Sequence, residues 1–440
     1  MKKRHIFTLF TIFLLISSLM ASALATSASG PDHQARAVVL ADAVTGDIIY
    51  ARNEQEQLHP ASITKIMTAL LVVEALDRGD VNINDVLTTS ETALAGLTET
   101  GMAIGLEVGE EMTLEPLLHA AMLISANDAA NVLAEHVGGS IENFLLMMNT
   151  RARELGAENT HFLNTHGLTE EGHFSTAYDL FRISQHAISL PRFAELYSLQ
   201  TRAFRATNQR PAGRFTSTNH MANPDRDEYY PGVFGVKTGF TNAAGWCLVS
   251  TAIQDDISLL AVVMGVPTDV EEVNHFSETA AIYDWAFETL EYIELLPATA
   301  EIARLSVELG DGVESVGLRP TDSVNALLPR GTTLQNVRQE ITEFYDEDNP
   351  LTAPVSRGDV LGEITLHYGG RVFGPISLVA AEAVHLSHGA FWQNEVGTTL
   401  DNVWVRVVII VLALLFILYI VYAILYAIKK RKRKKERLKR

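Results

Sequence analysis

The stretch PASITKIMTALLVVEAL, residues 60–76, places a serine and a lysine one helical turn apart at the start of an apolar segment. The residues after Lys65 are spaced as in a helix that packs into a protein core, and Pro60 stands just upstream. Positions i and i+3 of a helix share a face, so the side chains of Ser62 and Lys65 can touch. The pattern therefore places a lysine amine in apolar surroundings, directly beneath a serine hydroxyl.

This pair can perform nucleophilic chemistry only under particular conditions. A serine hydroxyl is a weak nucleophile until a base takes its proton. Lysine can be that base if its pKa falls toward neutrality, which burial, a second cation and a helix N-terminus all favour. By itself, Ser-x-x-Lys is a weak signal, because a capping serine and a lysine that extends its amine to the surface give the same letters.

Two further motifs carry residues of the same chemistry. ISANDAAN, residues 124–131, places Ser125 and Asn127 at the start of another apolar helical run. GVKTGF, residues 235–240, places Lys237 on a predicted strand, where it could be the second cation. Each motif has a plain structural alternative: Ser125 and Asn127 could cap a helix, and Lys237 could be a charge on a sheet edge. The three motifs together, in this order, are much harder to explain in that way.

The motifs S-x-x-K, S-x-N and K-T-G resemble those of the serine penicillin-recognising enzymes. The surroundings, such as FLNTHGL, STAYDL and GVFGVKTGFTNAAGWCLV, resemble the low-molecular-mass penicillin-binding proteins, the D-alanyl-D-alanine carboxypeptidases of peptidase family S11. The resemblance covers residues 35–290 and extends more weakly over 300–385. It implies an α+β fold with a penicillin-recognising serine transpeptidase/β-lactamase-like domain, in which helices flank an antiparallel sheet that carries a helical insertion.

The resemblance also implies a role for each motif residue. The catalytic set would be Ser62 as the acylated nucleophile, Lys65 as its general base, Ser125 as a proton relay and Asn127 as an orienting amide. The substrate-binding set would be Lys237, Thr238, Gly239 and Phe240. Lys237 and Thr238 would hold the terminal carboxylate, and the backbone N–H groups of Ser62 and Phe240 would form the oxyanion hole.

The implied substrate is a peptidoglycan stem peptide that ends in D-Ala-D-Ala, with β-lactams as covalent inhibitors. No cofactor and no metal ion is expected. The chain departs from some relatives at two places: Phe240 stands where they carry a histidine, and the strand ISLLAVVMG, residues 257–265, lacks a basic residue for the carboxylate. Side-chain assistance at these two positions is therefore in doubt.

The two ends of the chain predict export and a membrane anchor. Lys2, Lys3 and Arg4 precede an apolar run and the small-residue sequence ASALA, which favours a signal peptide over residues 1–25 rather than a retained anchor. Residues 405–428 form an apolar stretch long enough to cross a bilayer. The tail 429–440 holds ten Lys or Arg among twelve residues, which predicts a cytoplasmic C-terminus and an extracytoplasmic body on a single-pass cell-membrane protein.

The charge distribution argues against a nucleic-acid partner. Of the formal net charge of −19, residues 1–25 contribute +3, residues 401–428 are balanced and the tail contributes +9, which leaves −31 for residues 26–400. A body of this charge is repelled by nucleic acid and by anionic membrane surfaces. The membrane contact is therefore expected through the C-terminal helix alone.

The pattern of the chain predicts its internal organisation. We expect a catalytic domain over 30–295, a β-rich domain over 298–388 and a linker over 389–404. Within the catalytic domain, residues 35–53 and 245–266 are typical of hairpins, residues 77–230 are mostly helical in period, and residues 276–295 suggest a helix that Ser277 caps. The single cysteine, Cys247, is expected to be buried in a strand rather than reactive. His161, His166 and His173 lie on predicted loops without a zinc-site spacing, so structural or surface roles are expected.

Two other kinds of protein remain open as interpretations of these motifs. A class A β-lactamase shares them but needs a glutamate three residues before the Leu163-Asn164 pair, where this chain has Thr160. A non-enzymatic wall scaffold or antibiotic sensor would be expected to lose a motif or to carry a folded cytoplasmic output, and twelve residues are too few to fold. The enzyme interpretation predicts release of D-alanine from a pentapeptide.

Overall fold

A five-stranded antiparallel sheet organises the first part of the chain in the computed structural model, which describes residues 30–98, 101–346 and 348–437. Its order is β2-β1-β9-β8-β7, so β1, the first strand, pairs with β9, which follows some 200 residues later. The bounds are β1 Ala37–Asp42, β2 Ile48–Arg52, β7 Val233–Thr241, β8 Gly245–Gln254 and β9 Ile257–Val266. The predicted sheet and both predicted hairpins are confirmed.

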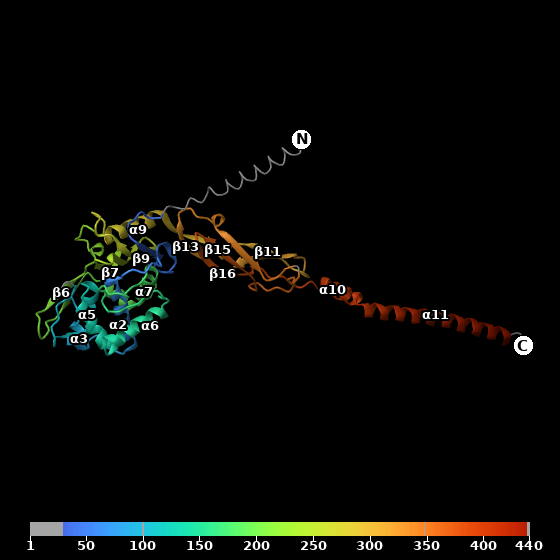
Figure 1. Cartoon of the computed structure of the whole chain (residues 1–440). Coiled ribbons are helices and arrows are strands. Elements are labelled where there is room, and N and C mark those ends of the chain that lie inside the picture. The colour runs from blue at the N-terminus through green and yellow to red at the C-terminus, as the bar shows by residue number, and fades with distance from the viewer. Residues whose placement is uncertain (1–29, 99–100, 347, 438–440) are drawn as a thin grey trace, which may run out of the picture. The chain divides into compact units, whose positions relative to one another are not determined.

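Helices cover both faces of this sheet (Figure 1). Alternate residues of β1 serve opposite cores: Val39 packs with the cluster that contains α2 (Lys65–Arg78) and α7 (Ala177–Ser189), whereas Val38 and Leu40 pack with α9 (His275–Thr289). Successive side chains of a strand point to opposite faces, so a fully buried, continuously apolar strand requires such a cover on each side.

The insertion between β2 and β7 is mainly helical, as predicted. It begins with the 3₁₀ turn η1 (Ala61–Thr64) and α2, and it contains α7. Its other described helices are α3 Glu91–Leu94, α4 Leu114–Leu123, α5 Asn127–Gly138, α6 Ile141–Glu154, α8 Pro191–Ser198 and η2 His220–Ala222. Two short strand pairs interrupt it, namely β3 (Val86–Thr88) with β4 (Glu111–Thr113) and β5 (Thr201–Phe204) with β6 (Gly213–Thr216). Helical periodicity alone did not indicate these pairs, because each strand has only three or four residues.

The prediction for residues 276–295 needs two corrections. The side chain of Asn274, not Ser277, caps α9, and Ser277 occupies the third helical position, where its hydroxyl completes a reciprocal capping box. The helix ends at Thr289, and Leu290–Leu296 form strand β10, which pairs with β13 (Val324–Pro329). The spacing of apolar residues in LEYIELL also fits a helix, but these residues alternate in burial as the residues of a strand do.

The chain divides into two compact units, of which the second includes Ile293–Ala326 and the residues from Thr332 onward. Its centre is an antiparallel sheet in the order β11-β12-β16-β15-β14, with bounds β11 Ala303–Ser306, β12 Ser315–Pro320, β14 Arg338–Glu343, β15 Val360–Tyr368 and β16 Arg371–Ala380. The short η3 turn spans Leu334–Asn336. This part of the chain is β-rich, as the alternating runs suggest.

Two helices follow this sheet. Residues expected as a linker contain the helix α10 (His388–Asp401), which the side chain of Ser387 caps. Helix α11 (Val403–Arg437) includes Val403–Arg431, a segment long and apolar enough to cross a membrane, and is the candidate membrane anchor. The predicted signal peptide, residues 1–25, lies outside the described residues.

Candidate active site

The turn η1 and the start of α2 bring Ser62 and Lys65 together. Lys65 Nζ lies 3.2 Å from Ser62 Oγ. The serine belongs to a 3₁₀ turn rather than to the α-helix itself, and in a 3₁₀ turn residues i and i+3 eclipse one another. The predicted contact is therefore present, made by a tighter helical turn than the one expected.

Lys65 is fully buried and has two further hydrogen-bond partners. Its Nζ donates to Asn127 Oδ1 at 2.7 Å and to the backbone oxygen of His166 at 2.8 Å. Burial lowers the pKa of Lys65 well below its usual value; the positive charge of Lys237 lowers it further, and Asp128 opposes the shift. The amine is therefore in surroundings that favour its neutral form.

The second motif lies at the start of α5. Ser125 has a φ of 63°, a left-handed conformation that is uncommon for a residue other than glycine, and this turn precedes the helix that carries Asn127. Ser125 Oγ is buried and makes no hydrogen bond within the described parts of the chain. A buried hydroxyl without a partner is costly, which suggests that Ser125 has a functional use.

The third motif lies on the edge strand β7. Lys237 is buried, and its Nζ donates to the backbone oxygen of Thr238 at 2.8 Å. Burial lowers the pKa of Lys237 to about 7. Among the described residues, no carboxylate lies within ion-pair distance of either buried lysine. The described part of the chain therefore leaves the Lys237 amine without a counter-charge, which the carboxylate of a ligand could supply.

Gly239 brings β7 against the nucleophile turn. A Cβ atom built on it would lie 3.2 Å from the backbone nitrogen of Ser62 and 3.2 Å from Ala61 Cβ, closer than most side chains allow. The glycine thus lets the backbone of β7 pass close to Ser62. The next residue, Phe240, is 42% exposed and packs on Trp246 with a ring separation of 4.2 Å.

A cleft of about 970 Å³ joins the three motifs. Six of the eight predicted site residues line it: Ser62, Ser125, Asn127, Thr238, Gly239 and Phe240. The two lysines lie buried next to these residues rather than on the wall of the cleft. All eight predicted residues are therefore associated with one site, although the motifs are separated by up to 175 positions in the chain.

The site contains further residues that the motifs did not indicate. The His166 backbone oxygen accepts a hydrogen bond from Lys65, Gly167 presses against Ala61, and the Thr218 hydroxyl lies 2.6 Å from that of Thr238. Backbone groups and long-range partners of this kind leave no spacing pattern. One signal was available, however: Lys65 and Lys237 are the only lysines between residues 4 and 428.

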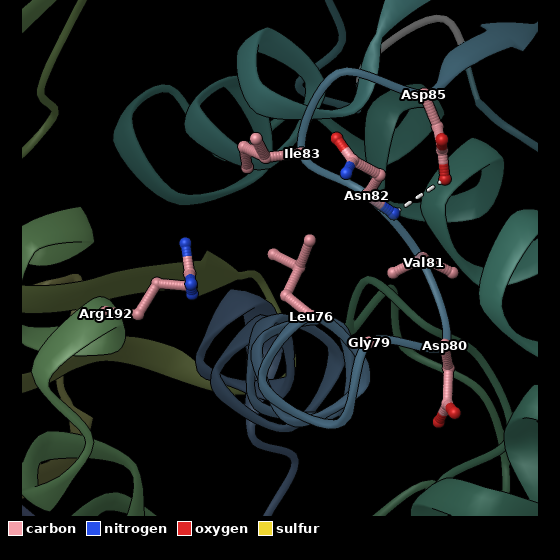
Figure 2. Close-up of a pocket in the computed structure, with 8 residues that line it drawn as sticks. All are labelled: Leu76, Gly79, Asp80, Val81, Asn82, Ile83, Asp85 and Arg192. Carbon is pink, nitrogen blue, oxygen red and sulfur yellow. Dashed lines mark hydrogen bonds between the residues drawn. The ribbon is translucent and has the colours of Figure 1, made fainter.

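A second hollow, of about 380 Å³, lies at the opposite end of α2 (Figure 2). Leu76, Asn82, Asp85 and Arg192 are among its lining residues, and the backbone N–H of Asn82 donates to Asp85 Oδ2 at 2.8 Å. Leu76 is eleven residues beyond Lys65, about 17 Å along the helix. This hollow contains none of the predicted site residues and is separate from the candidate active site.

A cleft-lining serine in contact with a buried lysine, a second serine with an asparagine, and a lysine-bearing strand define a serine acyl-transfer enzyme of the penicillin-recognising class. The D-alanyl-D-alanine carboxypeptidase family of peptidase S11 matches residues 24–268. The chain belongs to this family.

Individual relatives extend the match beyond the catalytic part. The chain is 35% identical to the D-alanyl-D-alanine carboxypeptidase DacF of Bacillus subtilis, over 80% of this chain and 86% of that protein. It is 30% identical to the D-alanyl-D-alanine carboxypeptidase DacC of Escherichia coli, over 84% of this chain and 90% of that protein. Penicillin-binding protein 5 of Haemophilus influenzae superposes with a TM-score of 0.62 at 28% identity and covers 82% of this chain and all of that one.

Proposed function

We propose that this protein is a serine D-Ala-D-Ala carboxypeptidase that removes the terminal D-alanine from peptidoglycan stem pentapeptides through an acyl-enzyme on Ser62. The observation that carries the proposal is the 3.2 Å contact between Nζ of the buried Lys65 and Oγ of Ser62 on the cleft wall. Family membership supports the reaction, and the geometry of the cleft supports the residue roles.

Counting hydrogen-bond donors explains why Lys65 can be the base. A neutral amine has two N–H groups and one lone pair. The two N–H groups match the Asn127 side-chain oxygen and the His166 backbone oxygen. The lone pair is then left for the Ser62 hydroxyl, so the hydroxyl can donate its proton to Nζ. The same contacts orient the amide of Asn127, whose oxygen must face Lys65.

The chemical steps follow from this arrangement. Ser62 Oγ attacks the carbonyl carbon of the last peptide bond while its proton passes to Lys65. The C–N bond then breaks as the departing amine receives a proton, a transfer that the Ser125 hydroxyl, which has no partner among the described residues, can relay. D-alanine leaves, and water attacks the ester on Ser62 and releases the shortened peptide. When a β-lactam acylates Ser62, its ring opens and the nitrogen of the broken bond stays attached to the acyl group, so no amine departs.

Substrate recognition rests on the third motif. A positive Lys237 with the Thr238 hydroxyl would bind the terminal carboxylate, which supplies the counter-charge that the described protein residues do not. The backbone N–H groups of Ser62 and Phe240 would stabilise the oxyanion. Gly239 has no side chain, so β7, which carries Phe240, can lie close to the turn that carries Ser62. No cofactor enters these steps.

The β-lactamase interpretation has less support. In a class A enzyme a glutamate at position 160 would activate the deacylating water. Here the Thr160 hydroxyl donates to Asp179 Oδ2 at 2.7 Å and lies 2.7 Å from Ser175 Oγ, an arrangement that ties the loop to α7. Slow hydrolysis of the penicilloyl-enzyme is expected for this reason.

The protein is proposed to lie on the outer side of the cytoplasmic membrane. Helix α11 would span the bilayer, and the basic tail would stay in the cytoplasm, because Lys and Arg next to a span favour that side. The acidic body would then face the cell wall that contains its substrate.

The test is the substitution Ser62→Ala in the detergent-solubilised full chain. The wild type should gain the mass of one penicillin molecule and release D-alanine from a stem pentapeptide, and Ser62→Ala should do neither. Ser198→Ala, on the exposed end of α8, is the matched control and should behave as wild type. Peptide binding without D-alanine release by the wild type would refute the enzyme proposal.

A further inference from the structure

A fully buried histidine, His173, lies behind the nucleophile turn and contacts protein atoms through both ring nitrogens. Its Nδ1 accepts a hydrogen bond from the backbone N–H of Leu163 at 3.0 Å. Its Nε2 lies 3.0 Å from the hydroxyl oxygen of Thr64, which is also fully buried. The motifs do not explain this residue.

These contacts determine where the protons are. A backbone N–H can only donate, so Nδ1 must be unprotonated and the ring must be neutral with its proton on Nε2. Burial lowers the pKa of His173 to about 4, in agreement with a neutral ring. Nε2–H then donates to Thr64 Oγ1, and the hydroxyl proton of Thr64 remains for the backbone oxygen of Ala61, which is 2.9 Å away. Together these contacts form a row of hydrogen bonds from Leu163 through His173 and Thr64 to Ala61, and each donor and acceptor in this row has a partner.

The row ends on the peptide that contains the nitrogen of Ser62. The carbonyl of Ala61 and the N–H of Ser62 belong to one trans peptide unit, so they point in opposite directions. When the carbonyl is held by Thr64, the N–H is aimed away from it; a Cβ built on Gly239 would lie 3.2 Å from the nitrogen of this group, so β7 passes close to it. The φ of Ala61 is 48°, an unfavourable value for alanine that surrounding contacts must maintain.

Building on the proposed function, we propose that His173 and Thr64 are positioning residues that fix the peptide plane of Ala61–Ser62 and thereby aim the Ser62 N–H at the developing oxyanion. Neither side chain touches the substrate. Their effect is on the transition state, because an oxyanion-hole donor acts where negative charge develops and contributes little to ground-state binding.

The variant Thr64→Val tests the row, and Thr64→Ser is its matched control. Valine keeps the shape of threonine but removes the hydroxyl, whereas serine keeps the hydroxyl and loses only a methyl group. Acylation of the full chain by a fluorescent penicillin would be followed by stopped flow, which separates the binding constant from the rate constant of acylation. Thr64→Val should lower the rate constant about tenfold or more and change the binding constant less than about twofold. Thr64→Ser should stay within about twofold of wild type on both.

Two outcomes would overturn the proposal. One is an equal acylation rate constant in Thr64→Val and Thr64→Ser; the other is a loss that appears only in the binding constant. A wild type that penicillin does not acylate would instead refute the proposed function.

A measurement on the wild type needs no variant of Thr64 and decides the proton positions directly. Long-range ¹H–¹⁵N spectra of the histidine-labelled full chain report the tautomer of each ring, and the signal lost in His173→Gln assigns His173. A neutral ring with its proton on Nε2 at pH 7 is the expected result. A proton on Nδ1, or a charged ring, would refute the row of hydrogen bonds.

Discussion

The two buried lysines have different tasks although the same burial acts on both. Lys65 must be neutral to accept the proton of Ser62, and Lys237 must be charged to bind a carboxylate. Burial lowers the pKa of both amines, and the positive charge of Lys237 lowers that of Lys65 further. The division of tasks requires the lower pKa to belong to Lys65, whose acceptors Asn127 and His166 are in place.

The first prediction concerns the pH dependence of kcat/KM. Lys237 carries its charge below its pKa of about 7, so substrate capture by the free enzyme should fall as the pH rises through this value. Lys237→Arg should abolish this alkaline decline, because arginine stays charged throughout the accessible range. The maximum kcat/KM of this variant should be about tenfold lower than that of the wild type, because a guanidinium does not match a site built for an ammonium group. D-alanine release measured from pH 5 to pH 10 tests both statements.

A substrate with an amidated C-terminus is the control for this profile. It lacks the carboxylate, so its slow turnover should not show the decline near pH 7. If Lys237→Arg kept the decline at the same pH with the natural substrate, the titrating group would be another residue.

The side chains of the site were predictable from the sequence, whereas their supports were not. Ser62, Ser125, Asn127 and Thr238 occur in motifs whose order identifies the chemistry, and the cleft unites them. The roles assigned to them remain predictions until the variants are measured. The His166 carbonyl contributes through its backbone oxygen, which any residue type carries. The residue type at position 166 therefore could not have indicated this contact.

At the scale of elements, the loop after α6 holds the nucleophile turn in place. Its backbone accepts a hydrogen bond from Thr68 of α2 at the oxygen of Thr165, 2.6 Å away. Two residues later Gly167 has a φ of 91°, and a Cβ built there would lie 1.8 Å from the Ala61 oxygen. The loop therefore requires a glycine at this position for two separate reasons, its backbone conformation and its contact.

The pair Gly167→Ala and Gly79→Ala separates these two reasons. Both glycines have positive φ, and both variants should lose about 1–2 kcal/mol for the left-handed conformation. Nothing lies within 4 Å of a Cβ at Gly79, whereas at Gly167 the overpacking should cost a further 1–3 kcal/mol or so. Calorimetry should therefore give the lower melting temperature for Gly167→Ala, and acylation by penicillin should slow in that variant alone. Equal melting temperatures and equal acylation would show that the loop does not support Ser62.

Long elements were predicted better than their ends and their small companions. The strands around β1 and β8 have continuous apolar runs with clear turns, so the sheet was predictable. The cap of α9 was misassigned because Asn274 and Ser277 both fit a capping role, and only the geometry distinguishes them. The pairs β3–β4 and β5–β6 were missed because strands of three or four residues are too short to show an alternating pattern.

At the scale of the whole molecule, charge separates the body from its anchor. A body of formal charge −31 precedes a candidate span and a tail of +9. Such a distribution should hold the tail at the anionic inner leaflet and leave the body free of the membrane surface.

Variants that each add one cysteine test the proposed sidedness. Cys247 is the only natural cysteine, and it is buried, with a pKa raised to about 12, so it should not react with a maleimide. The variant Gln393→Cys, at an exposed position of α10, should be labelled on intact cells by a membrane-impermeant maleimide. The variant Arg433→Cys, at an exposed position of the basic tail, should react only after the membrane is opened. Labelling of Arg433→Cys on intact cells would reverse the proposed orientation.

The scarcity of lysine gives this enzyme an unusual spectroscopic property. Between residues 4 and 428 the other permanently positive side chains are arginines. Isotope-labelled lysine would therefore label only Lys65 and Lys237 in this part of the chain. The many lysines of the tail would give signals typical of free side chains and would be easy to set aside. One label would thus display the ionisation of both amines, with and without penicillin, in the unmodified protein.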